Sequence, residues 1–157
     1  MDILSHALWG WVFLNGETWY LVFLFGILPD IISFGPSVVH MFFSGNLKPG
    51  KPDIATIPNY VFVIYNIIHS FAFVALVFLV IFLITKKVYL FMLAWPIHIL
   101  MDIPTHSKDF FPTKFLYPFS HYSFNGINWG QLWFMTLNYT LLFLAYGYLL
   151  LKKSTIL

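Results

Sequence analysis

The chain has 157 residues, of which 60% are hydrophobic and only 9% are charged, and its mean hydropathy is +0.81. Soluble domains carry roughly 25% charged residues, so this composition excludes a water-soluble domain and leaves lipid to cover the outside of the fold. All 8 basic residues are lysines, and a net charge of +2 is too thinly spread for a nucleic-acid partner. Because the chain has no cysteine, disulfides, thiolate metal sites and cysteine nucleophiles are excluded as well.

Long segments without charged residues indicate the membrane spans, because a helix needs about 20 apolar residues to cross the hydrocarbon core. In chain order we expect a short or re-entrant helix at residues 3–14 and spans at residues 18–34, 57–85, 88–103 and 131–151. Asp30 is expected near the end of the second helix. Pro104 is expected to close the fourth, because proline disfavours helical conformation at the residue before it.

Two longer connections, residues 35–58 and 105–130, are rich in proline, glycine, asparagine and aromatic residues. This composition is typical of loops and short helices at the membrane interface. The sequence shows no internal repeat, low-complexity tract or second domain. The expected fold is therefore all-α, with residues 1–157 forming a single domain, a polytopic membrane helix bundle of four to five spans.

Ionisable side chains in or beside these spans are the most informative feature of the sequence. Such groups are expensive in lipid and normally serve a function. They are His6, Asp30, His69, His98, Asp102 and, just beyond the fourth span, His106. When the helices alternate through the bilayer, all of them fall at the same side. The pattern therefore predicts one shared polar site at one membrane face, with these residues as candidate metal ligands.

The sharpest pair is His98 and Asp102, since residues i and i+4 lie on one helical face and both can point at one ion. His106 follows after the break expected at Pro104. Imidazole and carboxylate donors suit a divalent metal, zinc first, with manganese and iron as alternatives.

Each of the other residues has a simpler interpretation when taken alone. A lone membrane histidine such as His69 is more often a hydrogen-bonding group between helices than a ligand, and Asp30 fits a helix end at headgroup level. His6 taken alone is weak evidence for a metal site. His40 and His121 lie in the expected loops and are interpreted as loop histidines outside the site. The clustering of several residues at one face is what favours a metal site.

Several short motifs occur in order along the chain. The run from His98 to His106 reads His-x-x-x-Asp followed by a threonine, and a later run reads Leu-Tyr-Pro-Phe-Ser, ending at Ser120. Earlier motifs are Ser5-His6, Leu28-Pro29-Asp30 and His69-Ser70. Together they resemble the motifs of the bacterial and archaeal membrane-bound metal-dependent hydrolases.

This resemblance implies a protein of the prokaryotic cell membrane with a metal centre and hydrolase activity, distantly like the zinc-dependent phospholipases C. The substrate expected on this basis is a phosphate ester of a lipid headgroup, with His106 and Asp30 as catalytic residues. Lys108 and Lys114 would draw anionic headgroups to the site. The family often carries His-Arg before its third motif, where this chain has Ile-Tyr ending at Tyr65. The guanidinium best suited to grip a phosphate is therefore missing.

Two alternatives without hydrolysis remain open from the residues alone. His69 and His98 on facing helices could supply both axial ligands of a haem in an electron carrier, although Asp102 has no ready place there. Intramembrane carboxylates could instead line the path of an ion carrier. A zinc protease is disfavoured because the sequence has no His-Glu-x-x-His, and a serine hydrolase because it has no Gly-x-Ser-x-Gly.

Overall fold

Helices account for every regular element in the part of the chain that the computed structural model describes, residues 1–46 and 54–154. The α-helices are α1 (Ile3–Phe13), α2 (Trp19–Phe43), α3 (Asn59–Ile68), α4 (Phe71–Thr85), α5 (Ala94–Thr105) and α6 (Leu132–Ser154). Two short 3-10 helices are η1 (Ile54–Thr56) and η2 (Leu90–Leu93). The all-α class expected from the sequence is confirmed.

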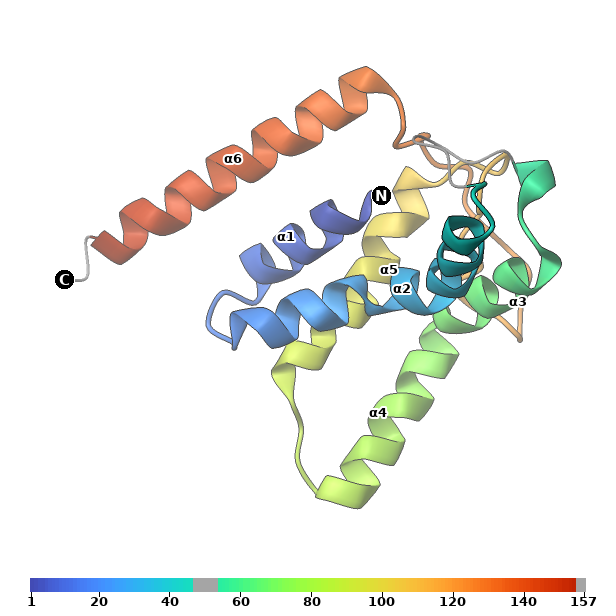
Figure 1. Cartoon of the computed structure of the whole chain (residues 1–157). Helices are drawn as coiled ribbons and strands as arrows, with labels where there is room; N and C mark the ends of the chain where they lie inside the picture. Colours follow the sequence, from blue (N-terminus) through green and yellow to red (C-terminus); the bar gives the residue numbers. More distant parts are fainter. Residues whose placement is uncertain (47–53, 155–157) are drawn as a thin grey trace.

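Helix α2 lies at the centre of the fold, where it contacts α1, α3, α5 and η2. Helix α1 packs between α2 and α6 and also contacts α5, while α4 extends away from the centre (Figure 1). The N-terminus lies beside α5 in the same view. Helices α1, α2 and α5 and the junction of α3 with α4 therefore surround a common centre.

Two helices are long and apolar enough to cross a membrane, α2 and the Leu132–Lys152 part of α6. A third span is possible if α3 and α4, which meet at a bend of 61°, are counted as one. Length and composition thus support two or three spans among the described residues, and the expected number of four to five is not confirmed. Helices α1 and α5 have 11 and 12 residues, and at about 1.5 Å per residue they reach little more than half of a hydrocarbon core about 30 Å thick.

The helix expected at residues 57–85 is broken at His69, which was expected well inside it. Ser70 is extended, and its hydroxyl accepts a hydrogen bond from Phe73 N at 3.2 Å, so it caps the start of α4. The indole of Trp95 on α5 donates to the carbonyl of Ile68 at the end of α3, at 3.0 Å. These contacts satisfy backbone groups at the break and turn His69 toward α5.

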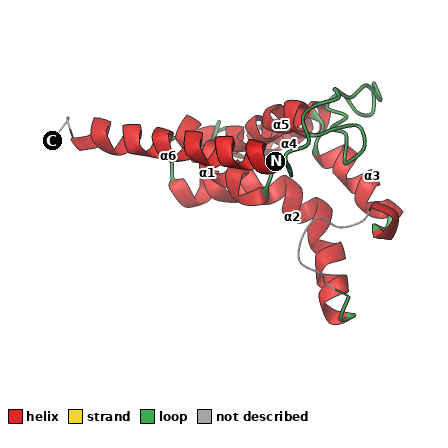
Figure 2. Ribbon diagram, turned by 90° about the horizontal axis from the view of Figure 1, so that it is seen from above, coloured by secondary structure: helices red, strands yellow, loops and turns green. Residues whose placement is uncertain are grey.

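Helix α2 is longer than expected, because it continues to Phe43 through residues that the sequence suggested were a loop. It contains Pro29 and Pro36, and Figure 2 shows that it changes direction along its length. Asp30 consequently lies near the middle of the helix instead of at its end. Pro104 likewise lies inside the last turn of α5, which ends at Thr105 instead of at the residue before the proline.

Polar side chains join α6 to α1. Asn138 donates to the Ser5 hydroxyl at 2.7 Å and accepts from the indole of Trp9 at 2.8 Å. The hydroxyl of Tyr146 donates to the carbonyl of Leu8 at 3.1 Å. Hydrogen bonds of this kind hold helices together where lipid offers no competing partners. They fix α1, and with it His6, from the side opposite α2.

The loop after α5 folds back against the end of that helix. Three backbone amides donate to its last carbonyls: Gly126 N to His106 O at 2.9 Å, Ile127 N to Pro104 O at 2.8 Å and Trp129 N to Thr105 O at 3.2 Å. A Cβ on Gly126 would lie 2.3 Å from Pro104 O and 2.8 Å from His106 O. Only glycine permits this approach, and the loop is thereby fixed over His106.

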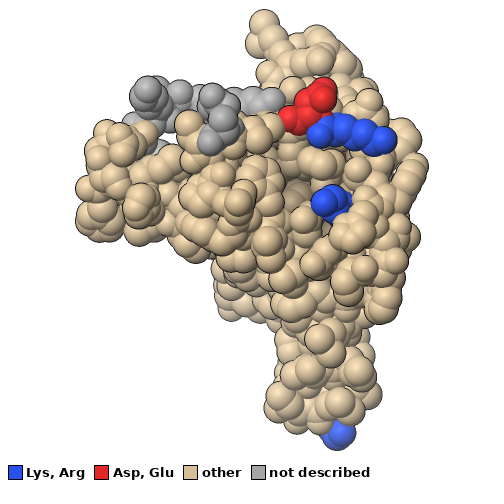
Figure 3. Space-filling model, turned by 90° about the vertical axis from the view of Figure 1, so that its right-hand side faces the viewer, with Lys and Arg blue, Asp and Glu red and all other residues tan. Residues whose placement is uncertain are grey.

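The outer helices carry apolar surfaces that are not covered by the rest of the chain. Val74 is the one buried residue of α4, and α6 exposes large side chains such as Leu132 and Phe143, which are 84% and 78% exposed. The face of the molecule drawn in Figure 3 carries few charged side chains. Surfaces of this kind suit lipid better than water, which supports a membrane protein.

Candidate metal centre

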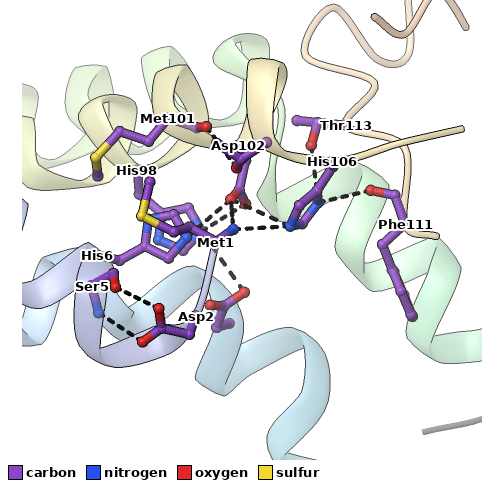
Figure 4. Close-up of polar contacts among 12 residues, drawn as sticks. Met1, Asp2, Ser5, His6, His98, Met101, Asp102, His106, Phe111 and Thr113 are labelled. Atoms are coloured by element: carbon purple, nitrogen blue, oxygen red, sulfur yellow. Dashed lines mark hydrogen bonds and ion pairs between the residues drawn. The ribbon is translucent and has the colours of Figure 1, made fainter. Parts of the chain in front are cut away.

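Buried polar side chains from α1, α2, the α3–α4 junction, α5 and the residue after α5 meet at the centre of the fold. They are the six candidate ligands of the sequence, each at most 5% exposed: His6, Asp30, His69, His98, Asp102 and His106. Figure 4 shows Asp102 between the rings of His6 and His98 on one side and His106 on the other. Residues separated by up to 100 positions are therefore brought into one cluster, as the sequence pattern suggested.

One group of donors is close enough to bind a single ion. Asp30, His69, His98 and Asp102 each offer a ligand atom, and these atoms lie within 4.8 Å of one another. Nε2 of His98 lies 3.2 Å from Oδ2 of Asp102, and Nε2 of His69 lies 3.5 Å from Oδ1 of Asp30. Donors of a tetrahedral zinc site with ligand distances of about 2.0–2.1 Å lie about 3.3–3.4 Å apart. This group could therefore hold a metal ion.

Backbone carbonyls fix the tautomers of two of these imidazoles. Nδ1 of His98 lies 2.7 Å from the carbonyl oxygen of Gly26, and Nδ1 of His69 lies 3.1 Å from that of Tyr65. A carbonyl oxygen only accepts, so each Nδ1 carries the hydrogen and each neutral ring presents its Nε2 lone pair. The two Nε2 atoms lie 3.1 Å apart. Two lone pairs at this distance repel each other unless a cation lies between them.

Gly26 sets the distance between α1 and α2 at the cluster. A Cβ on this residue would lie 3.1 Å from His6 O and 3.4 Å from the Cα of Ala7, so glycine permits close approach of the two backbones. The His6 ring then stacks on His98 with ring centroids 3.5 Å apart. Its Nε2 lies 3.0 Å from Oδ1 of Asp102. A short helix thus delivers one more imidazole to the cluster.

His106 faces the same carboxylate from the other direction, with Nε2 3.5 Å from Oδ1 of Asp102. Its Nδ1 lies 2.9 Å from the carbonyl of Phe111 and 2.8 Å from the hydroxyl of Tyr65, so the hydrogen is on Nδ1. Burial lowers the pKa of His106 to about 4, although Asp102 opposes this effect. The amine of Met1 lies 3.0 Å from Nε2 of His106 and 2.5 Å from Oδ1 of Asp102.

Three residues at the site were missed by sequence reasoning. Tyr65 stacks on the ring of His69 at 3.8 Å, and its hydroxyl lies 2.9 Å from that of Thr113. Phe111, which accepts from His106, is buried and adopts φ 49°, a conformation uncommon outside glycine. Tyr65 precedes His69 by one helical turn, so its spacing was a usable signal. The loop residues Thr113 and Phe111 had none.

The remaining sequence candidates lie outside the cluster. His40 and His121 are exposed, in agreement with their interpretation as histidines outside the site. Lys108 is exposed and Lys114 is partly buried, so neither belongs to the buried group of six residues. Their assignment to substrate binding stays a prediction.

A cavity of about 490 Å³ lies beside the cluster. Asp30 and His106 contribute to its wall, so the cavity reaches the candidate centre. Most of its other lining side chains are apolar and come from α1, α2 and the loop after α5, among them Leu4, Phe34, Val38, Met41 and Phe110. A molecule with a polar group at one end and an apolar body fits this distribution.

Compared with protein-family models, curated proteins and solved structures, the chain gives no match. The resemblance of its short motifs to membrane-bound metal-dependent hydrolases therefore stays a hypothesis. Function has to be inferred from the buried cluster and from the cavity that reaches it.

Proposed function

We propose that the protein is a metal-dependent membrane hydrolase that cleaves phosphate esters of lipids. The observation that carries the proposal is the 3.1 Å approach of Nε2 of His69 to Nε2 of His98, while each Nδ1 faces a carbonyl oxygen. A shared proton would satisfy this nitrogen pair. With the Met1 amine 2.5 Å from Oδ1 of Asp102, that proton would also balance the charge of the two carboxylates. A divalent ion is favoured because both nitrogens and both carboxylates, Asp30 and Asp102, offer ligand atoms within 4.8 Å of one another.

The donor set indicates which metals to test. Two imidazole nitrogens and two carboxylate oxygens suit zinc, with manganese and iron as alternatives. When bound, such an ion lowers the pKa of a coordinated water and polarises a phosphoryl oxygen. The protein holds the imidazoles in place through the carbonyls of Gly26 and Tyr65, which orient the donor atoms before any ligand arrives.

The cavity supports a lipid as the substrate. Its wall is mostly apolar but includes Asp30 and His106, so an acyl chain can lie against the apolar part while the headgroup reaches the cluster. Every phospholipid offers a phosphate ester at that depth. Lys108 and Lys114, in the loop that follows α5, would attract the anionic headgroup as point charges, without the bidentate grip of an arginine.

His106 and Asp30 are the groups that a substrate in the cavity would meet first. Nε2 of His106 carries the lone pair, since Nδ1 is engaged by Phe111 and Tyr65, and it faces the Met1 amine at 3.0 Å. This nitrogen could accept a proton from the attacking water and return it to the leaving group. It could equally bind a metal. Metal content of His106→Ala separates these roles, because removal of a base leaves the metal in place and removal of a ligand does not.

The alternatives left open by the sequence are less well supported. The rings of His69 and His98 have centroids 5.0 Å apart and interplanar angle 59°, which leaves no room for a porphyrin between them. An absorption spectrum of the purified protein tests the haem alternative directly. An ion carrier would use the same donors but would bind metal without hydrolysis, so activity measurements discriminate it from the enzyme.

The test uses the protein purified in detergent and supplied with phospholipid in mixed micelles. We expect near-stoichiometric metal by elemental analysis, release of a phosphate-ester product, and loss of that release on chelation. His98→Ala should lose metal and hydrolysis together, because its Nε2 lies among the closest donors. The control is His121→Ala, which changes an exposed histidine and should retain both.

Two results would contradict the proposal. Equal metal content in His98→Ala, His121→Ala and the unmodified protein would mean that the buried group does not bind the ion. A fully metal-loaded protein that cleaves no lipid or soluble phosphate ester would exclude the hydrolase and favour the ion carrier.

A further inference from the structure

The two oxygens of Asp102 face different sets of imidazoles. Oδ2 lies 3.2 Å from Nε2 of His98 and 3.6 Å from Nε2 of His69, within the donor group described above. Oδ1 lies 3.0 Å from Nε2 of His6 and 3.5 Å from Nε2 of His106, neither of which belongs to that group. One carboxylate therefore separates two sets of nitrogen donors.

His6 is the least satisfied member of the cluster. Both of its ring nitrogens are buried: Nδ1 has no hydrogen-bond partner among the described residues, and Nε2 faces Oδ1 of Asp102 at 3.0 Å without the geometry of a hydrogen bond. Buried polar atoms without partners are uncommon in folded proteins, because their desolvation is not repaid. The ring is held between α1 and His98 and directs Nε2 at Oδ1 of Asp102. This nitrogen therefore faces Asp102 at an oxygen that the first ion does not use.

The neighbouring groups indicate that this oxygen can bind a cation. Nδ1 of His106 faces the carbonyl of Phe111, so its Nε2 lone pair is directed to the same side of Asp102. The Met1 amine, itself a positively charged group, lies 2.5 Å from Oδ1 and 3.0 Å from that nitrogen. Two lone pairs and a carboxylate oxygen would bind a divalent ion at least as well as an amine.

The distance between the rings of His6 and His98 also fits a pair of metal ions. The rings of His6 and His98 are stacked with centroids 3.5 Å apart and an interplanar angle of 21°, and they point at different oxygens of Asp102. Ions bound in the planes of two such rings would be separated by about the stacking distance. Two-metal centres typically hold their ions about 3.5–4 Å apart.

We propose that a second divalent metal ion binds between His6, His106 and Oδ1 of Asp102, so that Asp102 bridges a two-metal centre. This inference rests on the proposed function for the first ion, bound at Oδ2. It assigns His106 to metal binding, and it gives the phosphate ester two cations to contact from the cavity side, where His106 lines the wall.

The test counts Mn(II) ions in the detergent-purified protein and records their electron paramagnetic resonance spectrum. We expect two ions per chain at saturation and the spectrum of an exchange-coupled pair, as two ions bridged by one carboxylate give. This measurement needs no variant. His6→Ala should then bind one ion per chain, with the coupling lost and an uncoupled Mn(II) signal retained, while the exposed His40→Ala should still bind two.

The outcomes separate this inference from the proposed function. One uncoupled ion per chain in the saturated, unmodified protein would overturn the second site and would mean that the Met1 amine holds that position. If that protein still hydrolysed phosphate esters, the proposed function would stand. Two coupled ions without hydrolysis would support the two-metal centre and contradict the enzyme, and no bound ion at all would overturn both.

Discussion

Gly126→Ala tests how the loop after α5 holds His106 in place. The added methyl would lie 2.3 Å from Pro104 O, 2.5 Å from Pro104 C and 2.8 Å from His106 O. All three atoms belong to the backbone and cannot rotate aside as a side chain would. Since carbon rarely approaches such atoms closer than about 3.4 Å, the loop must move by about 1 Å or more.

The cost has two parts. Overpacking of a tight contact typically costs about 1–3 kcal/mol. The shift also strains the three hydrogen bonds that join the loop to the end of α5, at 2.9, 2.8 and 3.2 Å, each of which contributes about 1 kcal/mol. If they are weakened rather than all lost, we expect Gly126→Ala to lower the free energy of unfolding by about 2–4 kcal/mol.

Thermal unfolding in detergent measures this effect, and a shift of about 2–4 °C is expected for each kcal/mol in a chain of this size. The matched control is Gly16→Ala, because a Cβ there meets nothing within 4 Å. We expect the control to unfold near the temperature of the unmodified protein. Equal midpoints for the two variants would show that the loop does not pack against α5 as described, and the placement of His106 would then have to be revised.

Two further changes test the surroundings of the site. Tyr65→Phe removes the hydroxyl that lies 2.8 Å from Nδ1 of His106. We expect it to lower the hydrolysis rate by about 10-fold or more, while the metal at Asp30, His69, His98 and Asp102 is retained. An unchanged rate would exclude a positioning role for Tyr65. Asn138→Leu removes two hydrogen bonds between α6 and α1 and should lower the free energy of unfolding by about 1 kcal/mol. Thr136→Val is its control in the same assay, because that hydroxyl donates only within α6, to Leu132 O.

The sequence predicted the helical class and the members of the polar cluster for a clear physical reason. Charged and imidazole groups are so rare in apolar helices that each one is conspicuous, and the i, i+4 spacing of His98 and Asp102 fixes their common face without any tertiary information. Their separation of 3.2 Å between Nε2 and Oδ2 agrees with that spacing. Whether they bind metal stays a prediction.

The helix boundaries were less predictable, because they depend on contacts between distant segments. Residues 57–85 carry no charge and contain no proline after Pro58, so nothing local marks the break at His69. The break is stabilised by Trp95, which donates to the carbonyl of Ile68 from another helix. In the opposite direction, the composition of residues 35–58 suggested a loop, whereas α2 in fact continues to Phe43.

The break at His69 connects the fold to the chemistry. At the break, His69 N still donates to the Tyr65 carbonyl at 2.8 Å, Nδ1 of the same residue lies 3.1 Å from that oxygen, and Nε2 is directed at His98. The bent pair of helices thereby presents a candidate ligand at a fixed tautomer. The 61° bend between α3 and α4 and the placement of one imidazole in the buried cluster therefore coincide at His69.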